Sequence, residues 1–278
     1  MTSTIFSSKP RKAWYLDHSA WLIETGTQRY LFDYGRLPRR ASGGGLESGV
    51  FDPAAFGDQP LTVFFSHQHG DHYHPDLHRQ LGMAGKANVI VGLNAGQLVS
   101  GMMMERTSIM RPRDMLQKNE LLILASGSTD SGVSFLVVAP DFVCYHGGDL
   151  AAWDDTAWFR EAYRKEIDWL SDRLSETGRI LDVAMLPVST SDGYQEEVLL
   201  EGVDYALEKL RPRQILPMHG FGFESLYMDF AARESRKAVP TLVHLPVQVC
   251  GADGEDGVIG KDGKKGKAKN ATDGILLI

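Results

Sequence analysis

The segment Ser-His-Gln-His-Gly-Asp-His at positions 66–72 constrains the fold of this chain more than any other stretch. It directly follows the apolar run 61–65, which is rich in β-branched and aromatic residues and is preceded by Pro60. A short run of this composition beside a proline is typical of a buried strand. The sequence therefore predicts a core strand that ends in a histidine-rich loop.

The spacing of side chains within this loop predicts metal binding. In an extended chain alternate side chains share a side, so His67 and His69 are placed to point at one centre, while Asp71 and His72 face a second. Neutral imidazole and carboxylate groups are ligands for Zn, Mn or Fe. The alternative is a solvated histidine-rich tract, but the specific spacing directly after a predicted core strand disfavours it.

Length, charge and cysteine content limit the class of protein. At 278 residues the chain can bury a substantial core, and one large α/β domain is the simplest expectation. The net charge of −7 argues against a nucleic-acid partner, because binding to its backbone needs a basic face. Cys144 and Cys250 lie far apart in apolar runs, which favours reduced thiols and a cytoplasmic location. We expect no signal peptide and no membrane span, since no stretch approaches the ~20 apolar residues that a span requires.

Strand and helix patterns alternate along the second half of the chain, which fits sheets covered by outer helices. Strands are predicted at 13–16, 20–24, 28–33 and 88–91, then at 108–111, 120–125, 133–138 and 142–146 as a second sheet, and at 183–188, 214–217 and 241–245. Helices are predicted at 75–81, 94–105, 156–176, 196–210 and 223–237. We expect a domain at 1–250, followed at 251–278 by a flexible Gly-, Lys- and Asp-rich segment with a short final strand.

The His-x-His-x-Asp-His string at 67–72 resembles the signature of the metallo-β-lactamase-fold superfamily. The resemblance implies an α/β fold, a four-layer αββα sandwich of two mixed β-sheets flanked by helices. It extends to Tyr-His-Gly-Gly-Asp at 145–149 and to Leu-Pro-Met-His-Gly at 216–220. It implies that Asp149 bridges both metals and that His219 is the last histidine ligand. Among branches of the superfamily, the chain looks most similar to the ascorbate-6-phosphate-lactonase-like group.

Asp33, at the end of the strand predicted at 28–33, has a supporting role by the same resemblance. In the superfamily an aspartate at this place lies behind the histidine-rich loop, here residues 66–72 and called the metal loop below. This implies that Asp33 orients a ligand rather than binding metal. An ordinary aspartate at a strand end is the alternative interpretation.

One departure from the superfamily pattern concerns the first metal. The superfamily usually supplies a third histidine to that metal, whereas residues 125–132 contain none. Asp130 is the candidate substitute ligand, and its oxygen would shift selectivity toward Mn or Fe relative to Zn. The alternatives are a water held by Ser128 or Thr129, and a weak first centre with only the second centre well filled by Asp71, His72, Asp149 and His219.

The other histidines have less specific surroundings. We interpret His18, His74 and His244 as structural or surface residues, and His78 as a solvated residue of the helix after the loop. His146 could point toward the site or away from it.

These features predict a metal-dependent hydrolase that uses one or two divalent ions, with zinc favoured and manganese or iron as alternatives. A metal-activated water would be the nucleophile, and Asp71 would be the catalytic residue that orients it or takes its proton. Lactone, other ester, amide and phosphodiester bonds all suit this chemistry. Two other functions stay open: an iron-dependent oxidoreductase on the same fold, and a metal-stabilised binding protein without turnover.

The expected substrate is a small molecule. Arg36, Arg39 and Arg40 lie in the irregular stretch 36–59, whose length suggests a rim over the site. These arginines would favour an anionic substrate if they contact it, although a solvated charge cluster is the stronger interpretation. The sequence does not predict the oligomeric state.

Overall fold

A computed structural model describes residues 11–36, 43–55, 59–85, 87–99, 106–190, 196–220, 222–246, 258–259 and 275–277. Within these residues the strands form two mixed sheets. The first has the order β15-β1-β2-β3-β4-β5-β6, and its members are Arg11–Asp17 (β1), Ala20–Glu24 (β2), Arg29–Phe32 (β3), Leu61–Phe65 (β4), Ala87–Gly92 (β5), Thr107–Met110 (β6) and Ile275–Leu277 (β15).

The second sheet has the order β14-β13-β12-β11-β10-β9-β8-β7. Its members are Met115–Lys118 (β7), Leu121–Ser126 (β8), Ser134–Val138 (β9), Val143–His146 (β10), Val183–Pro187 (β11), Gln214–Met218 (β12), Leu242–His244 (β13) and Val258–Ile259 (β14). The helices are Pro75–Ala84 (α1), Leu93–Gly96 (α2), Ala157–Glu176 (α3), Glu196–Leu210 (α4) and Ser225–Ser235 (α5), with 3-10 turns at Leu46–Ser48 and Pro53–Ala55.

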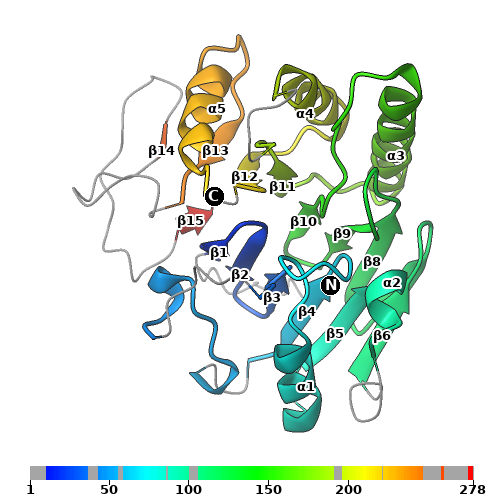
Figure 1. The fold of residues 1–278 in the computed structure, drawn as a ribbon, viewed down its shortest axis with the longest axis vertical. Coiled ribbons are helices and arrows are strands. Elements are labelled where there is room, and N and C mark those ends of the chain that lie inside the picture. The colour runs from blue at the N-terminus through cyan, green and yellow to red at the C-terminus, as the bar shows by residue number, and fades with distance from the viewer. Residues whose placement is uncertain are drawn as a thin grey trace, which may run out of the picture.

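The helices lie outside the two sheets (Figure 1). α3, α4 and α5 cover the second sheet, and α1 lies on the opposite side of the molecule beside the first. This arrangement confirms the predicted α/β class with two mixed sheets flanked by helices. Among the described residues, no helix is both long enough and apolar enough to cross a membrane.

β4 is buried on both faces, which explains its unbroken apolar run. Phe64 belongs to the core between the sheets and lies 5.2 Å from Phe135, ring centre to ring centre. Val63 and Phe65 face the other way and pack in a second core with Leu77 of α1. Strands buried on both faces are apolar at every position rather than at alternate ones.

The strands from β3 to β6 run parallel to one another, and so do those from β10 to β13. In open α/β sheets, ligands bind beyond the carboxyl ends of parallel strands. The loops that follow β4, β10 and β12 are therefore the natural place for a functional site.

Several sequence expectations need correction. The strand expected at 108–111 is not part of the second sheet, because Thr107–Met110 pairs with β5 in the first. β7 was not predicted, because its side chains alternate between exposed and half-buried and include Gln117 and Lys118. In the stretch expected as a helix at 94–105, the described helical part is Leu93–Gly96, and residues 100–105 lie outside the described residues.

At the C-terminal end, β15 pairs antiparallel with β1, with Leu277 opposite Arg11. Most of 251–274, together with Cys250, lies outside the described residues. Cys144 is a buried free thiol on β10.

Candidate metal centre

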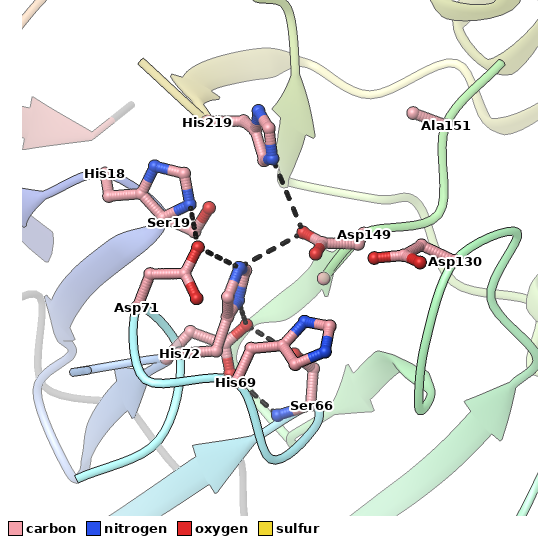
Figure 2. Close-up of polar contacts among 12 residues, drawn as sticks. His18, Ser19, Ser66, His69, Asp71, His72, Asp130, Asp149, Ala151 and His219 are labelled. Carbon is pink, nitrogen blue, oxygen red and sulfur yellow. Dashed lines mark hydrogen bonds and ion pairs between the residues drawn. The ribbon is translucent and has the colours of Figure 1, made fainter. Parts of the chain in front are cut away.

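Side chains from both sheets converge beyond the carboxyl ends of their strands. The loop after β4 brings His67, His69, Asp71 and His72 from the first sheet. Asp149 follows β10 and His219 follows β12, so both come from the second sheet. Figure 2 shows a continuous series of contacts that links these two groups across the interface between the sheets.

Glycines allow the backbone of the metal loop to approach its neighbours closely. A Cβ atom on Gly92 would lie 2.1 Å from the Ser66 carbonyl oxygen, and one on Gly132 would lie 2.2 Å from it. A Cβ atom on Gly35 would lie 2.1 Å from the carbonyl of Asp71. Any larger residue at these positions would displace the loop, so the glycines help to fix where its side chains point.

Asp33 holds the loop from behind. Its carboxylate accepts hydrogen bonds from the Ser66 backbone N–H at 2.7 Å, the Ser66 hydroxyl at 2.6 Å and His72 Nδ1 at 2.7 Å. Burial raises the pKa of Asp33, but His146 and His72 outweigh this effect and hold it below its ordinary value. Because His72 donates from Nδ1, its Nε2 lone pair faces the site. Asp33 thus contacts a candidate ligand and lies behind the site.

Two carboxylates lie close to His72 Nε2. Asp149 Oδ1 lies 3.2 Å from this atom and Asp71 Oδ2 lies 3.7 Å from it. His219 Nε2 lies 3.9 Å from the same Asp149 oxygen. His219 Nδ1 donates a hydrogen bond to the Ser189 carbonyl at 2.9 Å. In the neutral imidazole, Nε2 then carries the lone pair that can coordinate a metal. These four residues are the set expected for the second centre.

The first centre has one buried side and one exposed side. His67 is buried, and its Nε2 lies 3.3 Å from Asp149 Oδ2. His69 and Asp130 are exposed, and together with Asp149 they place three candidate ligand atoms within 4.8 Å of one another. The structure therefore places Asp130, the predicted substitute for the histidine that this chain lacks, beside His69 and Asp149.

The electrostatics of the site favour an added positive charge. Burial raises the pKa of Asp149 to about 7. Burial alone would lower the pKa of His72, but the carboxylates of Asp149 and Asp33 outweigh it and raise the value to about 9. Burial lowers the pKa of His67 and of His219 to about 3, so both imidazoles are neutral at physiological pH.

The donor atoms also fit a metal. The buried atoms His72 Nε2 and Asp149 Oδ1 have no hydrogen-bond partner among the described residues. Buried polar atoms without partners are costly unless a cation or water satisfies them. Imidazoles and carboxylates that converge in this way are a donor set suited to one or two divalent ions.

His18 is a site residue that the sequence analysis did not identify. It lies between β1 and β2, is buried, and places Nε2 3.2 Å from Asp71 Oδ2. His18, Asp71 and His72 form a further group of candidate ligand atoms within 4.8 Å of one another. Nothing in the local sequence of this turn distinguishes a ligand from a turn residue.

The remaining histidines have structural contacts. His146 points toward the backbone, where Nε2 donates to the Ser19 carbonyl at 2.9 Å and Nδ1 accepts from Gly148 N. The interpretation of His78 as solvated is wrong, because it is buried between the Tyr73 hydroxyl at 3.0 Å and the Thr107 hydroxyl at 2.8 Å.

His74 and His244 are also accounted for. His74 caps α1 by accepting a hydrogen bond from the Leu77 N–H at 3.2 Å. His244 is buried on β13 and lies 2.8 Å from Gln214 Oε1.

Comparisons with known proteins give the following matches. A family model described as the beta-lactamase superfamily domain matches residues 13–164. No curated protein matches the sequence. The structure resembles Igni18, a metallo hydrolase from Ignicoccus hospitalis, with 18% identity and a TM-score of 0.52 over 76% of this chain and 83% of that one.

Two further solved structures have weaker likeness. YhfI of Bacillus subtilis, a metallo-β-lactamase-fold protein, has 13% identity and a TM-score of 0.48 over 76% of this chain and 86% of that one. CmlA, a diiron β-hydroxylase from Streptomyces venezuelae, has 12% identity and a TM-score of 0.46 over 77% of this chain and 45% of that one. This chain thus spans less than half the length of CmlA. At these identities the likeness concerns the fold.

Proposed function

The chain belongs to the metallo-β-lactamase-fold superfamily, and from that premise we propose that it is a metal-dependent hydrolase of small molecules. Its reaction adds water across a lactone, other ester, amide or phosphodiester bond. The convergence of imidazoles and carboxylates around the buried Asp149 carries this proposal. A centre of this composition supplies the activated water that such bonds require.

We assign the ligands to two centres that share Asp149. The first centre consists of His67, His69, Asp130 and Asp149. The second centre contains Asp71, His72, Asp149 and His219. The two oxygens of Asp149 support this division, because Oδ2 lies beside His67 and Oδ1 lies beside His72.

A bound divalent ion supplies acidity to a coordinated water and polarises the substrate oxygen. The residues of the chain position the reactants around it. Asp71 is only partly buried, with 29% of its side chain exposed, so its carboxylate can reach a water molecule at the site. Burial raises the pKa of Asp71, but His18 and His72 outweigh this effect and hold it below its ordinary value, so the carboxylate is ionised at neutral pH and available to orient the attacking water.

The acidic donor set favours a metal that accepts oxygen ligands. Asp130 and Asp149 give the first centre two carboxylates beside two imidazoles, a composition that suits Mn or Fe as well as Zn. The substrate is proposed to be a small molecule, and the net charge of −7 disfavours a nucleic acid. Arg36 is ion-paired with Asp76 at 2.5 Å, and Arg39 and Arg40 lie outside the described residues.

Metal analysis combined with a hydrolysis screen tests this function. Protein purified without an affinity tag should contain up to two divalent ions per chain by mass spectrometry. It should hydrolyse at least one member of a panel of lactones, esters, amides and phosphodiesters. Protein that takes up no ion after reconstitution with Zn²⁺, Mn²⁺ or Fe²⁺ would refute the proposal. A visible spectrum typical of bound iron, with redox turnover and no hydrolysis, would favour an oxidoreductase instead.

Asp71→Asn tests the catalytic assignment within the same screen. The amide keeps the size of the side chain but cannot take a proton from water, so turnover should fall by at least about 100-fold. Metal content should change much less. The matched control is Asp172→Asn, an exposed position on α3. Unchanged turnover in Asp71→Asn would remove Asp71 from the mechanism.

A further inference from the structure

The turn between β1 and β2 brings a fifth histidine to the site. Asp17 and His18 both have positive φ angles, of 115° and 51°, so the chain reverses sharply between the two strands. The side chain of His18 is 1% exposed, although it belongs to a turn. A turn histidine that is this deeply buried must have a specific environment.

That environment is the second centre. His18 Nε2 lies 3.2 Å from Asp71 Oδ2, and the same oxygen lies 3.7 Å from His72 Nε2. The three ligand atoms all lie within 4.8 Å of one another. Neighbouring ligands of one zinc ion, each about 2.0–2.1 Å from the metal, are roughly 3 Å apart in four- or five-coordinate geometry. The spacing of His18, Asp71 and His72 therefore suits a single ion.

The position of His18 is fixed from the second sheet. Its backbone carbonyl accepts a hydrogen bond from the N–H of His219 at 3.1 Å and lies 3.5 Å from the Tyr227 hydroxyl. The His18 ring lies 4.7 Å from the His219 ring and 5.2 Å, edge-on, from the His72 ring. Figure 2 shows His18 on the Asp71 side of the site, at one end of the contacts that lead through His72 and Asp149 to His219.

We propose that His18 is a metal ligand of the second centre through Nε2. The second centre then draws on three imidazoles and two carboxylates, namely His18, His72, His219, Asp71 and Asp149. This inference rests on the proposed function, because it adds a residue to the same metal site. The competing role for His18 is a hydrogen-bond donor that positions Asp71.

His18→Gln separates these two roles. A glutamine amide can still donate a hydrogen bond to Asp71, but it is a poor substitute for imidazole as a metal ligand. The affinities for two equivalents of Zn²⁺ are measured by competition with a chromophoric chelator, in wild type and variant. The loss of a hydrogen-bonding partner typically weakens metal binding by 10–100-fold. Removal of a direct ligand should weaken the second centre by more than about 100-fold and leave the first centre filled.

The spectrum of the Co²⁺-loaded protein provides a readout independent of activity. His18→Gln should change the intensity and position of the visible absorption bands, because it removes a nitrogen ligand. The matched control is His244→Gln, which alters a buried histidine on β13 and should leave both the affinities and the spectrum unchanged.

A measurement on the wild type covers the case in which His18→Gln fails to fold. Proton NMR of the Co²⁺ protein shows hyperfine-shifted, exchangeable N–H signals from coordinated histidines. A signal from His18 in addition to those of the other four ligand histidines supports the proposal, and its absence overturns it. If wild type binds two ions and His18→Gln binds them equally well with the same spectrum, only the His18 assignment fails. If wild type binds no ion, the proposed function fails first.

Discussion

The two proposed centres share Asp149 but differ in how firmly their other residues are held. In the second centre, His72 and His219 are each oriented by a hydrogen bond from Nδ1, to Asp33 and to the Ser189 carbonyl respectively. In the first centre, His67 is buried, whereas His69 and Asp130 are exposed. The second centre is the more buried of the two, although Asp71 is 29% and His219 17% exposed, and the first centre opens on one side to solvent.

Ligands held by hydrogen bonds behind them lose little conformational freedom when a metal binds, while exposed side chains must be ordered at that moment. We therefore expect the second centre to fill at lower metal concentration than the first. Solvent and substrate then have access from the open side of the first centre and from the partly exposed Asp71 of the second.

Asp149→Asn is the change with the largest expected effect on this comparison. Asp149 is the only described carboxylate that lies beside both His67 and His72, so its loss should empty both centres. Metal content per chain, measured after gel filtration, should fall from two ions to fewer than one. The apo protein should stay folded, because burial raises the pKa of Asp149 to about 7 and a neutral amide suits that environment. Retention of both ions would show that the centres do not share this residue.

His219→Ala should affect one centre and spare the other. Its Nε2 lies 3.9 Å from Asp149 Oδ1, on the side away from His67. The affinity of the second centre should fall by about 100-fold or more, while one ion stays bound at the first centre. The reciprocal variant His67→Ala should spare the second centre. If both variants lose both ions, the two centres are not independent and the comparison fails.

Asp130→Ala should have a smaller effect, confined to the exposed side of the first centre. An exposed carboxylate must be ordered when the metal binds, so its removal should weaken the first ion by about 10-fold. Preference for Mn²⁺ over Zn²⁺ should also fall, since an oxygen ligand is lost. Asp172→Ala on α3 is the matched control. An unchanged first centre would mean that Asp130 does not replace the missing histidine.

Parts of this site could be predicted from the sequence, because their residues are contiguous. One loop contains His67, His69, Asp71 and His72, and the apolar run of β4 predicts where that loop begins. Asp149 and His219 come from distant strands, and only the resemblance to a known family linked them to the loop. The structure brings them together, and their roles stay predictions until metal binding is measured.

Other parts depend on packing that local sequence does not encode. His18 reaches the site because the turn between β1 and β2 is hydrogen-bonded to His219 on the other sheet. His78 was expected to be solvated but is buried against Thr107 of β6, a strand that the sequence analysis assigned to the wrong sheet. In both cases a single side chain depends on contacts between segments far apart in the chain.

The smallest expected effect on metal binding comes from His244, which supports the strand that leads to His219. His244 lies 2.8 Å from Gln214 Oε1 at the start of β12, and burial lowers its pKa from 6.5 to about 4. As the pH falls below 6.5, His244 binds a proton in the unfolded chain but not in the folded chain. The free energy of unfolding therefore decreases between pH 6.5 and 4. At about 1.4 kcal/mol per pKa unit, the full loss is ~3 kcal/mol.

In His244→Gln this part of the loss should disappear. Urea unfolding of the apo protein at pH 7 and pH 4.5 should then show a smaller decrease in the free energy of unfolding than in wild type. Zinc affinity at pH 7 should match that of wild type. An equal decrease in both proteins would show that His244 is not the group that resists protonation, and a weakened second centre would show that the β12–β13 contact positions His219.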